Sequence, residues 1–112
     1  MPPRLPRLTL FTGGKECGLC EVRPFIMELM QVAKANLVAI RHTHPFEIKL
    51  WNIREPPTDA KEEEVHKWRR AYQYEIPVLH VDGQRALKNN ITQEDLRRVL
   101  DEWRAKNAEG KD

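Results

Sequence analysis

The sequence predicts an α/β domain: a mixed four-stranded sheet with three helices, in the order β-α-β-α-β-β-α. Short apolar runs typical of strands alternate with longer segments whose apolar residues recur every three or four positions. Near the end, Asp82-Gly83 is the typical two-residue connection of a β-hairpin. Helices between the early strands imply parallel crossovers, and the hairpin adds an antiparallel pair. We therefore expect helices on both faces of a mixed sheet.

The first strand and helix are predicted before residue 37. Residues 8–11 form a short apolar run between proline and glycine, as in a buried strand. Apolar residues then recur at helical spacing from Cys17 to about Asn36, which predicts the first helix. Pro24 lies inside this pattern and removes one intrahelical bond, so we expect a kink near Cys20. The apolar positions of this helix are Val22, Ile26, Leu29, Met30 and Ala33.

A second strand and helix follow. Residues 46–50 alternate in polarity, the run extends to Ile53, and Pro56-Pro57 ends it. Thr58 or Asp59 is then expected to cap a helix, with Glu62 as the capping-box partner of Asp59. The buried face of this helix is predicted to consist of Val65, Trp68 and Tyr72.

The last three elements have clear boundaries in the sequence. Residues 76–81 predict a third strand that starts near Pro77, and residues 84–87 return as the fourth strand. Thr92, with Asp95 three residues later, is expected to open the final helix. The apolar stripe of that helix is Leu96, Val99, Leu100 and Trp103.

Composition predicts one domain over residues 1–112, with its core at about 8–104. The chain is 40% hydrophobic and 32% charged, which excludes a disordered protein. Its net charge of +2 comes from scattered acids and bases, so we expect no nucleic-acid partner. No apolar run is long enough to span a bilayer, so we expect no membrane partner. We expect a monomer.

The start of the chain and the cysteine count bear on the compartment. Residues 1–7 are basic but short and broken by proline, unlike a secretory signal or an amphipathic transit peptide. Two cysteines exclude a secreted disulfide scaffold. We expect a reducing compartment, the cytoplasm by default, with the mitochondrion left open.

The most informative motif is Cys17-Gly18-Leu19-Cys20, the only pair of cysteines in the chain. A helix that begins at the first cysteine directs unpaired N–H groups and its positive dipole end at that sulfur. Both effects favour the thiolate, which is the reactive species. Cys20, three residues later, lies on the same helical face and is close enough to form a small disulfide. The motif predicts a redox pair.

Three other interpretations of the cysteine pair stay open. The pair could be half of a zinc site, completed by His42 and His44 or by His66 and His80, but His42-Thr43-His44 is too short for the usual second ligand pair. A static disulfide would close a three-residue loop and stabilise little. A lone C-x-x-C also arises by chance. We expect His42 and His44 to be solvated in a loop, place none of the four histidines in the site, and expect no metal.

Three segments carry a resemblance to a known family. They are residues 8–12 in the first strand, residues 17–21 around the cysteines, and residues 74–83 before the hairpin. With these motifs the chain resembles the glutaredoxins, within the thioredoxin fold, over roughly residues 8–104. It is most similar to the short, divergent glutaredoxin-like branch.

The resemblance implies roles for the matching positions. Cys17 would be the attacking thiolate and Cys20 the resolving thiol. Ile76-Pro77 would be a cis peptide whose backbone at Ile76 pairs with an extended substrate such as glutathione. Lys15 would offset the thiolate charge or meet a glutathione carboxylate. The expected substrate-binding residues are Lys15, Gly18, Leu19, Ile76 and Pro77.

Departures from the family pattern shape the expected function. Gly18-Leu19 replaces the usual Pro-Tyr or Pro-Phe, so the redox potential of the family does not carry over. Lys88-Asn89-Asn90 replaces a Gly-Gly pair near the glutathione site. We expect asparagine to preserve this turn and the chain to handle glutathione less well than an ordinary dithiol glutaredoxin.

The cysteine motif and the resemblance still lead us to expect a thiol–disulfide oxidoreductase that reduces protein or glutathione mixed disulfides. It would bind no cofactor, with glutathione as reductant and glutathione or a disulfide-bearing protein as partner. The alternatives are a redox-inert binding module and an iron–sulfur cluster carrier.

Overall fold

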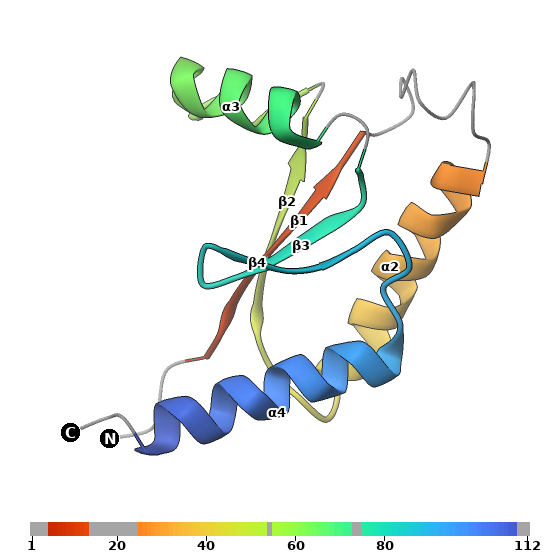
Figure 1. Ribbon diagram of the computed structural model, residues 1–112, viewed down its shortest axis with the longest axis vertical. Coiled ribbons are helices and arrows are strands. Elements are labelled where there is room, and N and C mark those ends of the chain that lie inside the picture. Colours follow the sequence, from red (N-terminus) through yellow and green to blue (C-terminus); the bar gives the residue numbers. More distant parts are fainter. Residues whose placement is uncertain (1–4, 14–24, 54, 73–74, 110–112) are drawn as a thin grey trace.

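The computed structural model describes residues 5–13, 25–53, 55–72 and 75–109 (Figure 1). Its elements, in chain order, are β1 (Arg7–Thr12), α2 (Phe25–Arg41), β2 (Glu47–Asn52), α3 (Glu62–Tyr72), β3 (Val78–Val81), β4 (Gln84–Lys88) and α4 (Gln93–Glu109). The four strands form one mixed sheet in the order β2-β1-β3-β4. The predicted element order is confirmed among the described residues.

The strand directions confirm part of the expected topology and correct the rest. β1 and β2 are parallel, with Leu8 opposite Ile48, and the β3–β4 hairpin is antiparallel. The third strand was expected to follow a parallel crossover, but β3 runs antiparallel to β1. The reason is the position of α3. Its 11 residues lie across the end of the sheet where β2 finishes, so the chain enters β3 from that same end (Figure 1).

Helices cover both faces of the sheet, as expected. On one face a mostly aliphatic core, called here the aliphatic core, joins β1 and β3 to α2 and α4, and its largest fully buried members are Phe46, Leu8 and Leu10. On the other face an aromatic core joins the sheet to α3 through Phe11, Trp51 and Tyr72, with Trp68 packed against it. Side chains of successive strand residues point to opposite faces, so Leu10 and Phe11 enter different cores.

α2 extends beyond its expected end near Asn36 and continues to Arg41. Leu37 and Ile40 continue the apolar spacing into the aliphatic core. Asn36 does not interrupt the helix, because its side-chain amide donates to the Ile91 carbonyl oxygen at 2.8 Å. The part of the prediction before Phe25, including the kink near Cys20, lies outside the described residues.

The predicted cap of α3 is wrong. The Ala60 N–H donates to the Pro57 carbonyl at 3.0 Å, so Thr58 and Asp59 lie in a separate turn. The helix begins at Glu62, and the Val65 N–H donates to the Lys61 carbonyl at 3.0 Å. The prolines at 56 and 57 favour this extra turn because neither can donate a backbone hydrogen bond. The buried face was predicted correctly: Val65 and Trp68 are half-buried and Tyr72 is buried.

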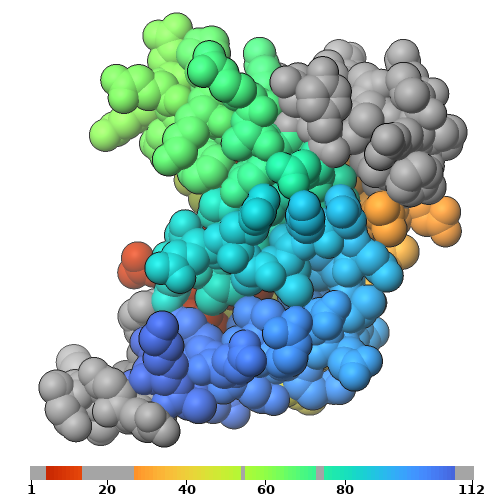
Figure 2. Space-filling model, viewed as in Figure 1, coloured from red at the N-terminus to blue at the C-terminus, as the bar shows by residue number. Residues whose placement is uncertain are grey.

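The hairpin and the start of α4 were predicted correctly. Asp82 and Gly83 have φ angles of 52° and 85°, the left-handed pair that a tight hairpin turn requires. Thr92 caps α4, since its hydroxyl accepts the Asp95 N–H at 3.0 Å. Figure 2 shows the hairpin exposed between α3 (green) and α4 (dark blue).

Candidate functional site

Three chain segments meet at the end of the sheet where β1 finishes. β1 pairs with β3 through Phe11 opposite Val78, so the chain leaves β1 beside the segment that precedes β3. Val78 in turn lies opposite Lys88, the last residue of β4. The Asn89 N–H then donates to the Pro77 carbonyl oxygen at 2.8 Å. The ends of β1 and β4 therefore flank the start of β3.

The Ile76-Pro77 peptide bond is cis, as the resemblance implied. Both side chains are buried, with Ile76 only 1% exposed. Regular pairing of β3 with β1 starts one residue after Pro77, at Val78. The Ile76 backbone makes no backbone hydrogen bond to another described residue. These two residues are the members of the predicted substrate-binding set that the structure describes.

The other predicted site residues, Lys15, Cys17, Gly18, Leu19 and Cys20, lie outside the described residues. The described chain stops at Gly13, four residues before Cys17 in the sequence. Gly13 is buried, and its N–H contacts the Met30 sulfur of α2 at 3.4 Å. This contact ties the end of β1 to the first half of α2.

Asn89 occupies the position where the family pattern has glycine. Its φ angle is 63°, in the left-handed region that glycine adopts most readily and asparagine tolerates better than most residues. The expectation that asparagine preserves this turn is confirmed. The Asn89 side chain is exposed, as are those of Lys88 and Asn90.

Glu75, which directly precedes Ile76-Pro77, is part of a small charge cluster that the sequence analysis missed. The Lys88 ammonium donates to its carboxylate at 2.9 Å, and Arg85 approaches the same oxygen at 3.6 Å. The hydrogen bond from Lys88 lowers the pKa of Glu75. Only the pairing of β3 with β4 brings the two cations to this acid, so nothing in the local sequence signals the cluster.

A buried polar pair lies under α3, where the sequence analysis assigned His80 no role. The Tyr72 hydroxyl and His80 Nε2 are 2.6 Å apart, and His80 is only 4% exposed. Burial lowers the pKa of His80, and the cations of Arg85 and Lys67 lower it further. Burial also raises the pKa of Tyr72. The Phe11 and Trp68 rings pack against the imidazole at centroid distances of 4.7 and 5.1 Å, so the pair belongs to the aromatic core.

The positions of His42 and His44 are relevant to the interpretation of the cysteine pair as half of a zinc site. His42 is exposed, as expected. The expectation that His44 is solvated is wrong: its side chain is 15% exposed, and its Nε2 is 2.9 Å from an Asp101 carboxylate oxygen on α4. That contact comes from tertiary packing between a loop and a distant helix. Within the described residues, no group of three or more His, Cys, Asp and Glu side chains is placed to hold a metal ion.

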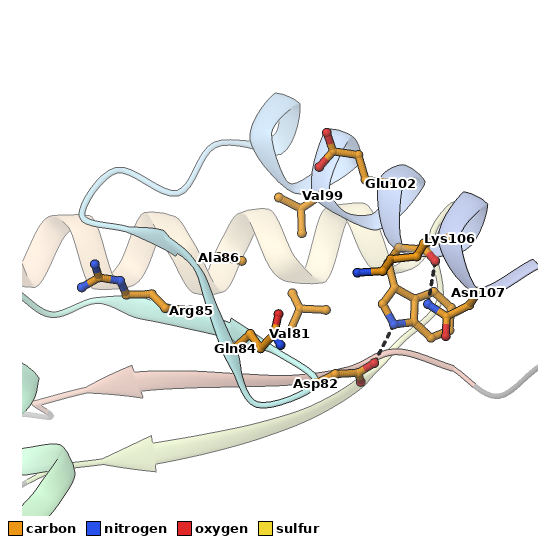
Figure 3. A pocket seen from close by; sticks show the side chains of 10 residues that line it. Val81, Asp82, Gln84, Arg85, Ala86, Val99, Glu102, Lys106 and Asn107 are labelled. Atoms are coloured by element: carbon orange, nitrogen blue, oxygen red, sulfur yellow. Dashed lines mark hydrogen bonds between the residues drawn. The ribbon is translucent and has the colours of Figure 1, made fainter. Parts of the chain in front are cut away.

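The structure also contains a groove at the opposite end of β3. It has a volume of about 600 Å³ and lies between the hairpin and α4 (Figure 3). The hairpin contributes Asp82 and Arg85 to the lining and the helix contributes Glu102 and Lys106, so acids and bases line it in equal number. The Trp103 indole N–H donates to Asp82 at 2.6 Å. This mixed lining selects no single ligand chemistry, and the groove is not part of the predicted site.

Comparison with known proteins gives a family and a fold. The sequence profile of the glutaredoxin-like domain (DUF836) matches residues 7–101. A crystal structure of SA0789, a protein of unknown function from Staphylococcus aureus, superposes with a TM-score of 0.55 at 13% identity. The superposition covers 88% of this chain and 91% of that one. None of the curated proteins matches this sequence significantly.

These findings establish the fold class. The mixed sheet, the three helices and the structural match define an α/β protein with a thioredoxin-like fold, as the sequence predicted. In the described part of the chain, no helix is both long enough and apolar enough to cross a membrane.

Proposed function

This chain belongs to the family of glutaredoxin-like domains (DUF836), and we propose that it is a thiol–disulfide oxidoreductase that uses Cys17 and Cys20. One observation carries the proposal. The C-x-x-C motif follows Gly13 by four residues, and the end of β1 lies beside the cis Ile76-Pro77 segment through the β1–β3 register. The end of β1, which the cysteine motif follows in the sequence, thus lies beside a backbone segment able to receive a substrate strand.

The proposed reaction consists of two thiol–disulfide exchanges. The Cys17 thiolate attacks one sulfur of the substrate disulfide, forms a mixed disulfide and releases the other sulfur as a thiolate. The Cys20 thiolate then attacks the Cys17 sulfur, which releases the second substrate thiol and leaves the Cys17–Cys20 disulfide. Two glutathione molecules restore the dithiol and leave as oxidised glutathione. No bound cofactor takes part, and the chemistry suits a reducing compartment such as the cytoplasm.

The Ile76 backbone has a defined part in this proposal. An extended substrate can pair with a free backbone segment in the manner of an added strand. Ile76 makes no backbone hydrogen bond to another described residue, and its buried side chain holds the backbone in place. In this proposal it aligns the substrate while Lys15, Gly18 and Leu19 contribute further contacts.

The first test measures reduction of a glutathionylated peptide by glutathione with the wild type, Cys17→Ser and Cys20→Ser. We expect the wild type to turn over and Cys17→Ser to be inactive. Incubated with the glutathionylated peptide in the absence of free glutathione, Cys20→Ser should retain a mixed disulfide at Cys17, visible by intact mass. Alkylation of Cys17 against pH should give an apparent pKa below the free-thiol value of about 8.5.

Two outcomes would overturn the proposal. A folded wild type that neither turns over nor forms a mixed disulfide indicates a redox-inert binding module. Visible cluster absorbance in freshly purified protein, lost in Cys17→Ser, indicates an iron–sulfur carrier instead.

A second test addresses the expected weak handling of glutathione. The left-handed turn at Asn89 carries a side chain where the family pattern has glycine, which limits how closely a ligand approaches the backbone. Loss of one charge-assisted contact costs about 1.5–3 kcal/mol, or roughly one to two decades of affinity. We therefore expect Asn89→Gly/Asn90→Gly to lower the KM for glutathione. A wild type as efficient as an ordinary dithiol glutaredoxin, with no gain in the double variant, would contradict this.

A further inference from the structure

β2 forms one outer edge of the sheet, and only β1 pairs with it among the described strands. The Glu47 N–H donates to the Pro6 carbonyl at 2.9 Å, and the Ile53 N–H donates to the Thr12 carbonyl at 2.8 Å. In a strand, the backbone groups of alternate residues point to opposite edges, so the odd-numbered residues here face β1. The outward-facing backbone groups belong to Phe46, Ile48 and Leu50.

An apolar surface adjoins this edge. A groove of about 290 Å³ lies between α2 and β2, and its apolar lining consists of Leu37, Val38, Phe46, Ile48 and Leu50. Val38 is 65% exposed and Leu50 is 53% exposed. Lys34 and Arg41 complete the lining, and both side chains are exposed. The side chains of Ile48 and Leu50 therefore offer apolar area beside backbone groups that no described strand pairs with.

The opposite face of the same strand carries alternating charge. The side chains of Glu47 and Lys49 point away from the groove, toward the α3 side, and both are exposed. Arg7 approaches Glu47 at 3.7 Å between two well-exposed side chains, a contact that is weak in water. An acid and a base two residues apart form a pattern that is complementary to itself when the strand is reversed.

We propose that two copies of this chain associate through β2, in an antiparallel pair with Ile48 opposite Ile48 of the second copy. In this register Phe46 of each copy lies opposite Leu50 of the other. The outward-facing N–H and C=O groups of these residues and of Ile48 form the hydrogen bonds between the two strands. Glu47 lies directly opposite Lys49 of the second copy, at a non-hydrogen-bonded position where side chains approach most closely.

The neighbouring registers are disfavoured by charge. A two-fold axis at Glu47 would place Glu47 opposite itself, and an axis at Lys49 would place Lys49 opposite itself. An axis at Leu50 would set Lys49 against Trp51 and form no ion pair. A register shifted by one residue would place outward-facing residues of one copy opposite inward-facing residues of the other, so their backbone groups could not form hydrogen bonds. Only the axis at Ile48 satisfies the backbone, the charges and the apolar residues together.

The other outer strand lacks these properties. β4 contains Arg85 and Lys88 and no acidic residue, so self-pairing can form no cross-strand ion pair. Its pairing with β3 also shifts register between Leu79 and His80, an irregularity that weakens an edge for further pairing. The proposal is therefore specific to β2, and it replaces the monomer that composition led us to expect. It is independent of the proposed redox activity.

The test is the molar mass in solution, measured by light scattering or sedimentation across a dilution series with a thiol reductant present. The wild type should approach twice 13.2 kDa at high concentration. Glu47→Lys and Lys49→Glu should each weaken the dimer about tenfold or more, because each turns two attractive cross-strand pairs into repulsive ones. The double reversal Glu47→Lys/Lys49→Glu should restore the dimer, and Lys61→Glu on the exposed surface before α3 serves as the matched control.

A second variant tests the backbone contribution. Leu50→Pro removes an outward N–H that the β1–β2 ladder does not use, so it should block association while the circular dichroism spectrum stays native. Leu50→Ala keeps that N–H and should weaken the dimer less. A wild type that stays monomeric overturns the proposal. So does a dimer that is unaffected by the single charge reversals, or one that disappears with the reductant.

Discussion

The two faces of the sheet are packed with different chemistry. The face under α2 and α4 is filled by aliphatic side chains such as Leu10 and Leu79, each fully buried. The face under α3 is aromatic and contains the hydrogen-bonded Tyr72–His80 pair. Dispersion and the hydrophobic effect hold the first core and do not depend on pH, whereas the second contains groups that titrate. The same sheet thus has one face with an apolar core and one whose core contains the titratable Tyr72–His80 pair.

The largest expected effect is a cavity in the aliphatic core. Leu79 is fully buried in the central strand β3, so Leu79→Ala should lower the free energy of unfolding by roughly 2–5 kcal/mol. Chemical denaturation at pH 7 measures this loss. Val38→Ala is the matched control, since Val38 is 65% exposed and its truncation should cost less than about 0.5 kcal/mol. Equal losses in the two variants would show that this face is not a close-packed core.

A smaller loss is expected from the polar pair on the other face. Tyr72→Phe keeps the ring and removes the hydroxyl that bonds His80 Nε2, which leaves a buried polar atom unpaired. The free energy of unfolding should fall by about 1–3 kcal/mol. Adding His80→Phe to Tyr72→Phe should cost less than the sum of the two single losses, because both partners are then apolar. Strict additivity would mean that the hydrogen bond contributes nothing.

The pH dependence should distinguish the two faces directly. The pKa of His80 lies below its ordinary value of 6.5, so the unfolded chain binds a proton first as the pH falls. The contribution of neutral His80 is therefore complete above about pH 6.5 and is lost as the pH falls through the lower folded pKa. We expect the loss on acidification to shrink in His80→Phe and to persist in Leu79→Ala. Unfolding curves between pH 7 and pH 5 measure it, and identical pH profiles in all three proteins would refute the assignment.

The smallest effect is expected outside both cores. Arg98 on α4 approaches Asp95 at 3.4 Å and Glu102 at 3.9 Å, all with exposed side chains. Exposed pairs of this kind contribute about 0–1 kcal/mol, so Arg98→Ala should change the midpoint of urea unfolding only slightly. The small change should vanish in high salt. A change comparable to that of Tyr72→Phe would show that α4 depends on surface charge rather than on its apolar face.

Local signals in the sequence determined most of the elements. The Asp82-Gly83 dipeptide defines the hairpin because few other residues adopt two consecutive positive φ angles. Thr92 and the apolar spacing after it define the start and buried face of α4. The cysteine motif and Ile76-Pro77 are likewise short-range patterns, and the cis peptide confirms one of them.

Only the tertiary structure decided the features that join distant segments. The antiparallel direction of β3 follows from where α3 lies on the sheet, which no residue within β3 encodes. The partners of Glu75 and His44 come from a neighbouring strand and a distant helix. His80 has an ordinary strand sequence around it, and its burial against Tyr72 depends on how α3 packs. Local sequence determines backbone conformation over a few residues, whereas burial, charge pairing and strand direction depend on which segments the complete fold brings together.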